Sequence, residues 1–440
     1  MLGGHRPGLA GYRSLPRPQK GCGRRRARLM IWLLIIPAGV IVYAWIVYPA
    51  LLALLAAWRT TAATPEPASP VGVQAGWVAV ILSAYNEEKV IARRIRNLIE
   101  TCRPSAGTPR VRVLVGIDGA TDRTAELARL SAEGHSFMEV VEFRQRRGKV
   151  AVLKDLAGTV IRQEEPREGI LVFTDANTNF LPGSFEKLLE ALNNERAGGA
   201  SGRLIFRRSL EASGSAEPFY WDMETRMKTW ESALDSCLGA NGAIYAVRSN
   251  LFWRDIPSDT IVDDFVIGMK VREQGWRMVY VPEAVAEEDL PAERAEWRRR
   301  VRIGAGDFQA LLLCRRCLNP AMGLFAWFFL SHKVLRWLTP VLLVWLLAIS
   351  CVCAASDGSA ARIAGRAAMA GFALWFALAA GASPAAAGTG RTAAFLRLLR
   401  HAAMMQAAVL VGFVKFATRQ AGGAWEPTPR ASNPPRSEKP

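Results

Sequence analysis

The strongest constraint on how this chain folds is a set of acidic residues that each follow an apolar run. They are Asp118, Asp175 and the adjacent pair Asp263 and Asp264. A carboxylate just past a β-branched strand points into the crevice where open α/β sheets bind their ligands. Several carboxylates at one sheet edge suit a divalent cation and a diphosphate. The pattern therefore predicts an α/β domain with a ligand site at one edge of its sheet.

Charge and cysteine content exclude some classes of function. The net charge of +17 is partly concentrated in residues 1–29, which hold eight Lys or Arg and no Asp or Glu. The basic residues cluster beside apolar segments rather than among aromatics, which favours anionic lipid over nucleic acid as a partner. The seven cysteines are scattered and odd in number. This usage does not indicate a disulfide framework.

Long apolar segments flank a polar block. Residues 30–58 exceed the roughly 20 residues that a membrane span needs and are too long for a signal peptide, so we predict an uncleaved span. Residues 334–418 are predicted to hold about three further spans, and residues 320–333 an amphipathic helix in the membrane interface. The polar block, residues 60–319, is predicted to be the catalytic domain. Arg391, Arg397 and Arg400 place their loop on the cytoplasmic side by the positive-inside rule.

The two ends of the chain lack hydrophobic periodicity. Residues 1–29 are rich in Gly, Pro and Arg, and residues 419–440 are rich in Pro, so both are predicted to be disordered. Because Met30 starts the apolar run directly, we hypothesise that it is the initiator and that residues 1–29 are an extension that is not translated.

The polar block alternates between strand and helix periods. Residues 77–82, 111–117 and 170–174 read as buried strands, and the segments that follow them carry helical apolar periods. This alternation predicts right-handed crossovers and a mainly parallel sheet.

The order of the motifs resembles that of membrane-bound glycosyltransferase family 2. The nearest likeness is to the branch of poly-N-acetylglucosamine, hyaluronan and cellulose synthases. Six motifs carry the resemblance: Ser83–Glu88, Asp118–Asp122, Gly148-Lys149, Asp175–Asn177, Gly239–Gly242 and Asp263-Asp264. The resemblance covers about residues 75–310 and implies a glycosyltransferase A-type three-layer α/β domain with flanking transmembrane helices.

Nucleotide binding is expected at the ends of the first two strands. The resemblance implies that Asp118 contacts the nucleotide base, while the alternative from its position is a helix N-cap. Asn86 and Glu87 are predicted to line the same pocket, and Asp122 to cap the following helix. Lys149 either meets a phosphate or keeps its basic loop solvated.

The resemblance implies a divalent metal, Mg²⁺ or Mn²⁺, at Asp175 and Asn177. These residues match the family's Asp-x-Asp, whose carboxylates hold an ion that bridges the diphosphate. Asn177 offers an uncharged oxygen in the second position, so the site has one formal charge fewer.

The acceptor end is predicted from the later motifs. Asn241 and Gly242 match an element that lies under the donor sugar and acceptor, and a tight turn is the alternative. Asp263 and Asp264 match an acidic pair whose second member is the catalytic base. Two adjacent acids raise each other's pKa, which helps a carboxylate take a proton. The alternative is complementation of a helix dipole.

An arginine-rich helix replaces the motif of processive members of the family. Arg299 stands at the position of the Gln in Gln-x-x-Arg-Trp, Arg302 at the Arg and Ile303 at the Trp. Arg299, Arg300 and Arg302 are still expected to bind diphosphate. The missing Trp removes a stacking platform for an acceptor sugar.

These features predict an inverting glycosyltransferase in the inner or plasma membrane, with its catalytic domain in the cytoplasm. Asp264 would accept a proton from the acceptor as a sugar moves from a nucleotide-sugar, a UDP-sugar, to a growing polysaccharide or a lipid-linked acceptor. Membrane lipid and export proteins are further expected partners. Two alternatives stay open: transfer of a single sugar to a lipid acceptor, and an inactive nucleotide-binding subunit of a polysaccharide export complex.

Overall fold

The computed structural model describes residues 20–62, 75–104, 109–164, 168–207, 217–289, 293–381 and 391–420. The chain forms two compact units, residues 1–39 with 342–374, and residues 40–341 with 375–440. The disorder predicted for residues 1–19 and 421–440 concerns positions outside the described ranges.

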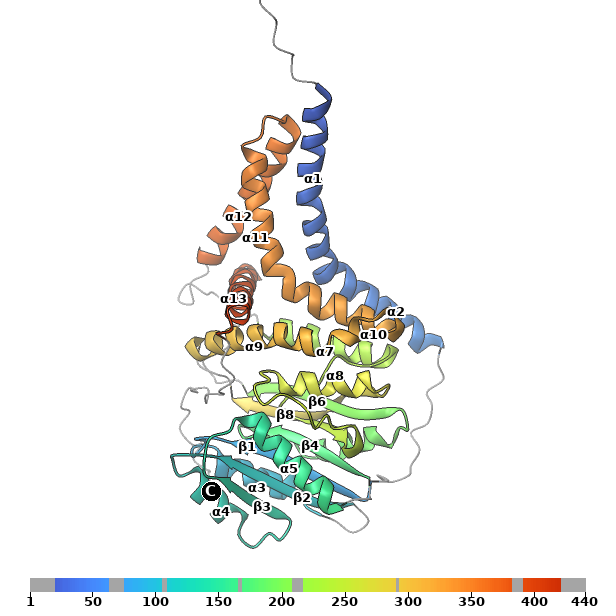
Figure 1. The fold of residues 1–440 in the computed structure, drawn as a ribbon, viewed down its shortest axis with the longest axis vertical. Coiled ribbons are helices and arrows are strands. Elements are labelled where there is room, and N and C mark those ends of the chain that lie inside the picture. The colour runs from blue at the N-terminus through green and yellow to red at the C-terminus, as the bar shows by residue number, and fades with distance from the viewer. Residues whose placement is uncertain are drawn as a thin grey trace, which may run out of the picture. The chain divides into compact units, whose positions relative to one another are not determined.

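Within the described residues, the larger unit is built on an eight-stranded sheet of order β3-β2-β1-β4-β7-β6-β8-β5 (Figure 1). The strands are β1 (Trp77–Ala84), β2 (Arg110–Asp118), β3 (Met138–Phe143), β4 (Gly169–Asp175), β5 (Thr178–Phe180), β6 (Ala197–Arg207), β7 (Tyr245–Arg248) and β8 (Arg277–Asp289).

The sheet is mixed and mainly parallel, as predicted: among the described strands, β6 and β8 run parallel to each other and in the direction of β4, and β7 and β5 run the other way. Strands β3, β2, β1 and β4 are parallel, whereas β7 runs antiparallel to both β4 and β6, and β5 runs antiparallel to β8. The short β5 follows β4 after two residues, but it pairs with β8 and not with β4. Ser83 of β1 lies opposite both Gly116 and Asp175, so Asp118 and Asp175 end at the same sheet edge.

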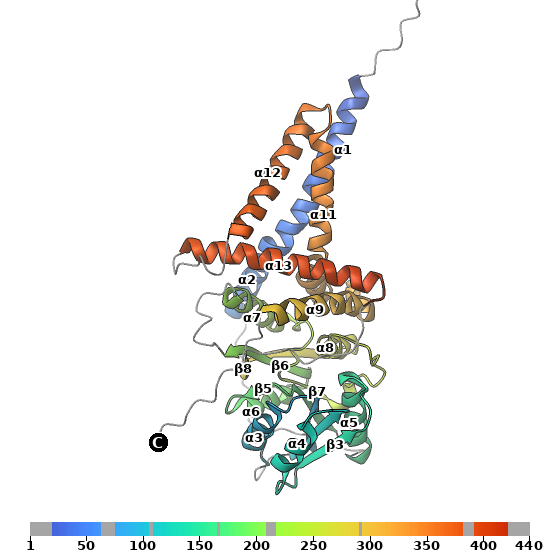
Figure 2. The same cartoon turned by 90° about the vertical axis from the view of Figure 1, so that its left-hand side faces the viewer.

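Helices cover both faces of the sheet, which gives the predicted three layers (Figure 2). They are α3 (Ile91–Thr101), α4 (Thr124–Ala132), α5 (Lys149–Glu164), α6 (Ser184–Glu190), α7 (Glu217–Leu234) and α8 (Asp263–Glu273), and α9 (Glu293–Leu313) packs against α8.

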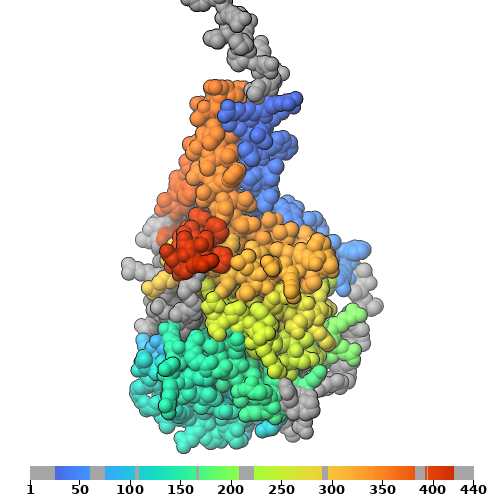
Figure 3. Space-filling view, in the orientation of Figure 1, coloured from blue at the N-terminus to red at the C-terminus, as the bar shows by residue number. Residues whose placement is uncertain are grey.

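The strand period decides which helix packs on which face. In β1, Val80 and Leu82 share a core with Ile95 of α3, whereas Ile81 packs with Val152 of α5 on the opposite face. Alternate side chains of a strand point to opposite faces, and both faces are covered here, so the strand reads as one continuous apolar run. On the α5 side, the surface of α5 (teal) and that of the α8 region (yellow-green) adjoin in the space-filling view (Figure 3).

Among the described residues, four helical stretches are long and apolar enough to cross a membrane: Arg25–Arg59, Leu324–Ala354, Ser359–Gly381 and Phe395–Ala417. They comprise α1 (Lys20–Val42), α2 (Tyr48–Ala62), α10 (Leu324–Phe328), α11 (Leu335–Ala354), α12 (Ser359–Gly381) and most of α13 (Arg391–Ala417), with π-helical turns at Tyr43–Val47 and Phe329–Val334.

Two predicted boundaries change. Residues 20–29, expected to be disordered, form the first turns of α1, because their arginines continue the apolar helix that follows. The separate interfacial helix expected at 320–333 is instead largely continuous with α11, since the π-helical turn joins them without a break.

The smaller unit consists of helical segments of α1, α11 and α12. Gly365 of α12 lies against α11, where an added Cβ would come within 2.5 Å of the Ala354 nitrogen. Small residues allow such close helix packing in membranes. Trp32 and Ile363 stay more than half exposed, at 57% and 69%. Large exposed apolar side chains of this kind are typical of a surface that faces lipid.

A buried polar cluster joins α7 to the start of the segment Leu324–Ala354. Glu231 accepts a hydrogen bond from the Tyr48 hydroxyl at 2.8 Å and lies 2.6 Å from His332 Nδ1. Glu224 accepts hydrogen bonds from Arg336 Nη1 at 2.9 Å and Lys333 Nζ at 3.1 Å. Buried charges need such partners, so these contacts fix the helices to one another.

Candidate active site

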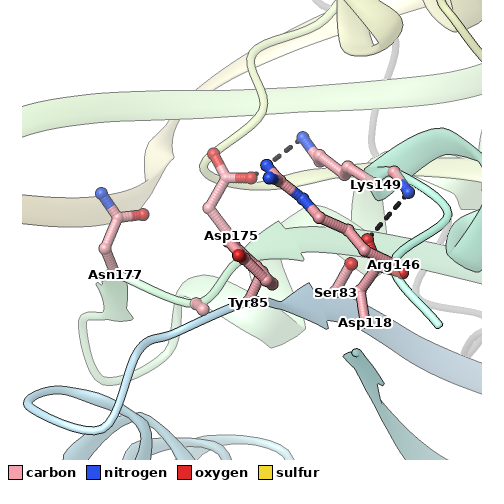
Figure 4. Close-up of a pocket in the computed structure, with 9 residues that line it drawn as sticks. Ser83, Tyr85, Asp118, Arg146, Lys149, Asp175 and Asn177 are labelled. Carbon is pink, nitrogen blue, oxygen red and sulfur yellow. Dashed lines mark hydrogen bonds and ion pairs between the residues drawn. The ribbon is translucent and has the colours of Figure 1, made fainter. Parts of the chain in front are cut away.

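Asp118 holds the loop that precedes α5. Its two carboxylate oxygens accept the backbone N–H groups of Arg147 at 2.7 Å and Gly148 at 2.8 Å. Gly148 has a φ of +91°, a conformation that favours glycine. Asp118 is 2% exposed and lines a small pocket with Tyr85, Lys149 and other residues (Figure 4). The contact with a nucleotide base stays a prediction, and this loop anchor is a role that the sequence did not indicate.

Lys149, the first residue of α5, lies between two carboxylates. Its Nζ is 3.0 Å from Asp175 Oδ1 and 3.3 Å from Asp263 Oδ2. Burial alone would lower the pKa of Lys149, but Asp175, Asp263 and Asp264 together raise it. The ammonium is therefore charged, and of the two roles predicted for Lys149, solvation of the loop does not fit its position (Figure 4).

Asp263 and Asp264 open α8 and differ in their surroundings. Burial raises the pKa of Asp263 to about 6, Lys149 opposes the shift, and the carboxylates of Asp264 and Asp175 add to it. Asp264 Oδ2 accepts the Gly242 N–H at 2.5 Å. Asp263 is thus held by a lysine, whereas Asp264 is oriented by a backbone amide.

Gly242 brings Asp175 and Asp264 face to face. A Cβ at this position would lie 3.1 Å from Asp175 Oδ2 and 3.1 Å from Asp264 Oδ2. A side chain here would crowd both carboxylates, so glycine allows the close approach that is seen. The neighbouring Asn241 uses its Oδ1 to accept the Ala243 N–H at 3.0 Å, as the tight-turn alternative predicts.

A cavity of about 280 Å³ is lined by these carboxylates. It is also lined by Lys228 of α7, Asp307 of α9, and Lys333 and Trp337 of the segment Leu324–Ala354. Burial raises the pKa of Asp307 to about 7, with Lys333 and Arg300 opposing. Sequence analysis missed these residues, because they lie in no recognisable motif and meet only in the fold.

Asn177 has a partner that the sequence did not reveal. Its Nδ2 donates a hydrogen bond to Glu288 Oε1, and Glu288 lines the same cavity as Asp175. The contact arises because β5 pairs with β8, with Thr178 opposite Glu288. The only signal in the sequence is the acidic run Glu287–Asp289 at the end of a strand.

Asn86 and Glu87 follow β1 and contact the segment that follows β2. Asn86 adopts a φ of +51°, and its Oδ1 accepts the Thr121 N–H at 2.9 Å. The side chain thus ties the end of β1 to the loop after β2. Glu87 is buried, at 6% exposure. Asp122 accepts the Thr124 N–H at 3.0 Å at the start of α4, in keeping with its predicted capping role.

The three arginines of α9 that were predicted to bind diphosphate do not all line the cavity. Arg299 and Arg302 line the cavity, as residues three apart on one helix face do. Arg300 is instead 7% exposed, and its Nε pairs with Glu296 on the same helix. Burial, together with the neighbouring Arg299, lowers the pKa of Arg302.

The acidic centre fits a divalent cation that takes most of its ligands from the phosphate oxygens of a substrate and from water. Among the residues that the structure describes, no three His, Cys, Asp or Glu side chains form a metal centre by themselves. Asp175 Oδ2 nevertheless faces Asp264 across Gly242 and lines the cavity. A donor set of one carboxylate completed by phosphate oxygens and water is what Mg²⁺ prefers.

Comparison with solved structures shows the class of fold. A mannosyltransferase of Pyrobaculum calidifontis, PcManGT, solved with GDP-mannose and Mn²⁺, matches with a TM-score of 0.61 at 21% identity. The match covers 88% of this chain and 99% of that one. The polar block therefore has the glycosyltransferase A-type fold, a nucleotide-sugar-binding α/β fold.

Comparison with models of protein families is more specific than the comparison of folds. The model of glycosyl transferase family 2 matches residues 79–256, and that of glycosyl transferase family group 2 matches residues 170–383. The two matches together take in every motif from Asp118 to the arginines of α9. Both models describe the family that the motif order predicted.

Two curated relatives agree with this assignment. The probable glycosyltransferase YdaM of Bacillus subtilis (strain 168) is 23% identical over 252 residues, which are 53% of this chain and 56% of that protein. The succinoglycan biosynthesis protein ExoU of Rhizobium meliloti (strain 1021) is 32% identical over 112 residues, 26% of this chain and 29% of that protein. The chain thus spans between about a quarter and three fifths of these relatives' length.

Proposed function

We propose that this protein transfers a sugar, with inversion, from a UDP-sugar to a polysaccharide or lipid-linked acceptor at the membrane. One observation carries the proposal: Asp175 and Asp264 both approach Gly242, and all three line the same cavity. That arrangement puts a group able to bind a diphosphate-bound cation opposite a group able to take a proton.

The chemistry follows from these positions. The acceptor hydroxyl attacks the anomeric carbon, its proton passes to Asp264, a new C–O bond forms, and the bond to the diphosphate breaks. Asp264 is suited to this because Gly242 fixes one of its oxygens and the other can accept the proton. Lys149, Arg299 and Arg302 offset the charge of the leaving diphosphate. A divalent ion at Asp175, with Asn177 beside it, supplies further electrostatic stabilisation when bound.

The part of the cavity lining that comes from a candidate membrane span favours an acceptor that reaches the site from the membrane surface. Lys333 and Trp337 belong to the candidate span Leu324–Ala354, and Lys228 is a second cation beside them. A lipid-linked acceptor would present its apolar part to the helices and its polar end to Asp264. Single transfer to a lipid is thus a second candidate beside polymer growth, and Ile303 in place of a stacking Trp supports it.

Donor turnover tests the proposal directly. The purified full-length protein in detergent or vesicles should release UDP from at least one UDP-sugar in the presence of Mn²⁺, and GDP-mannose should be included in the screen. Radiolabelled product from native membranes should then be sized: one added sugar indicates single transfer, and a ladder indicates polymerisation. Binding of UDP without release from any donor would instead indicate the inactive subunit.

Residues 60–319 should face the cytoplasm, because nucleotide sugars are made there. Glu133 is exposed on this domain, so Glu133→Cys, made in a chain with Cys22 and Cys351 replaced by Ser, offers an accessible thiol. A membrane-impermeant maleimide should label it only after cells are broken. Equal labelling in intact cells would overturn the proposed orientation. The same chain without Glu133→Cys controls for the remaining, buried cysteines.

A further inference from the structure

The charge balance of the acidic centre points to competition for Asp175. Three carboxylates, from Asp175, Asp263 and Asp264, converge there, and the ammonium of Lys149 contacts two of them at 3.0 and 3.3 Å. Asp175 is also the residue that would hold the divalent cation. Two positive charges, the Lys149 ammonium and the divalent cation, would therefore compete for the carboxylate of Asp175.

Resting on the proposed function, we propose that Lys149 is the resident cation of this centre and competes with the divalent ion for Asp175. The divalent ion binds Asp175 well only when the Lys149 ammonium leaves Oδ1. The diphosphate of the donor receives that ammonium, so ion and nucleotide bind as a coupled pair.

The loop geometry allows this exchange without a change of backbone. Asp118 holds the N–H groups of Arg147 and Gly148, so the start of α5 stays in place. The side chain of Lys149 is 21% exposed and lines both the small pocket and the larger cavity. A lysine ammonium is a point charge on a flexible four-carbon stem, which lets Nζ swing from carboxylate to phosphate.

Electrostatics sets the sign of the coupling. A divalent ion bound at Asp175 while Nζ remains on the same carboxylate would meet a like charge a few ångströms away, which weakens binding strongly at this depth. Moving the ammonium onto a diphosphate removes that repulsion. Because linkage is reciprocal, the nucleotide raises the affinity for the ion by the same factor as the ion raises the affinity for the nucleotide.

The test is Mn²⁺ binding to the full-length protein, measured by the electron paramagnetic resonance of free Mn²⁺, with and without UDP. Without UDP, Lys149→Met should bind Mn²⁺ about tenfold or more tightly than wild type, since one competing charge is gone. UDP should raise Mn²⁺ affinity strongly in wild type and much less in Lys149→Met. A pH of about 8 keeps Asp263 ionised, because loss of the ammonium raises its pKa further.

Matched variants separate the outcomes. Lys154→Met removes a lysine from the same helix, where Nζ donates to the Ile256 carbonyl at 2.8 Å, and should leave Mn²⁺ affinity unchanged. Lys149→Arg keeps the charge and should stay near wild type, and Lys149→Gln replaces Lys149→Met if the latter does not fold.

Failure of the inference and failure of the proposed metal site give different results. If Asp175→Ala abolishes Mn²⁺ binding but the neutral Lys149 variants bind no more tightly than wild type, the competition is wrong and the site stands. If Asp175→Ala binds Mn²⁺ as wild type does, the metal site itself is wrong, and the competition falls with it.

Discussion

Asp264→Asn is expected to lower turnover by about 10²–10⁴-fold, the usual contribution of a general base. Asparagine has nearly the same size and keeps an oxygen that can accept the Gly242 N–H, so the loop before β7 should hold its position. Affinity for the UDP-sugar should stay within a few-fold, because Asp264 acts on the acceptor rather than on the nucleotide. Initial rates at saturating donor, together with UDP binding by calorimetry, measure both effects.

Asp118→Asn is the matched contrast. Both oxygens of Asp118 accept backbone N–H groups, so an amide places an N–H donor against one of them and disturbs the loop that carries Lys149. Nucleotide affinity should fall first, and rates should recover at high donor concentration. Normal turnover of Asp264→Asn, or a defect confined to UDP binding, would contradict the assignment and make Asp263 the better candidate for the base.

Asp175→Ala is expected to abolish Mn²⁺ binding and to lower turnover by at least about 10²-fold, since electrostatic stabilisation of a leaving group is a large part of catalysis. Wild-type activity should fall on chelation and return with Mg²⁺ or Mn²⁺. Mn²⁺ binding and UDP release, each measured with and without EDTA, provide the two readouts. Full activity of Asp175→Ala in excess EDTA would show that no ion acts at this position.

Asn177 and Glu288 offer a charge swap that probes the same site. Asn177→Asp alone sets a carboxylate against the acceptor oxygen of Glu288 and loses the hydrogen bond between them. The double variant Asn177→Asp with Glu288→Gln restores that bond with the charge moved next to Asp175. Its Mn²⁺ affinity should match or exceed that of wild type, as expected for a complete Asp-x-Asp.

The sequence predicts well where these strands end, because a carboxylate after an apolar run marks both the end of the strand and a candidate site residue. Asp118 and Asp175 each close an apolar run, and parallel neighbours bring such ends to one edge. The approach of Asp264 to Asp175 is harder to predict from the sequence, since it depends on Gly242 and on the antiparallel return through β7.

The sequence did not reveal contacts between residues that lie on elements far apart in the chain. Glu288 meets Asn177 only because β8 pairs with β5. Lys228 and Asp307 come from two helices whose apolar and polar positions do not mark a site. The role of Arg300 was predictable in principle, because helical phase separates it from Arg299 and Arg302 and sets it four residues after Glu296.

The polar cluster that joins α7 to the start of the segment Leu324–Ala354 has a consequence for how the protein can be truncated. Glu224 and Glu231 are satisfied by His332, Lys333 and Arg336, which follow the catalytic domain in the chain. A protein cut before Leu324 would lose His332, Lys333 and Arg336 as partners, while Glu231 would keep the Tyr48 hydroxyl. Removing one partner of a buried charge pair is strongly destabilising. Residues 60–319 are therefore not expected to be stable as a separate domain without the segment Leu324–Ala354.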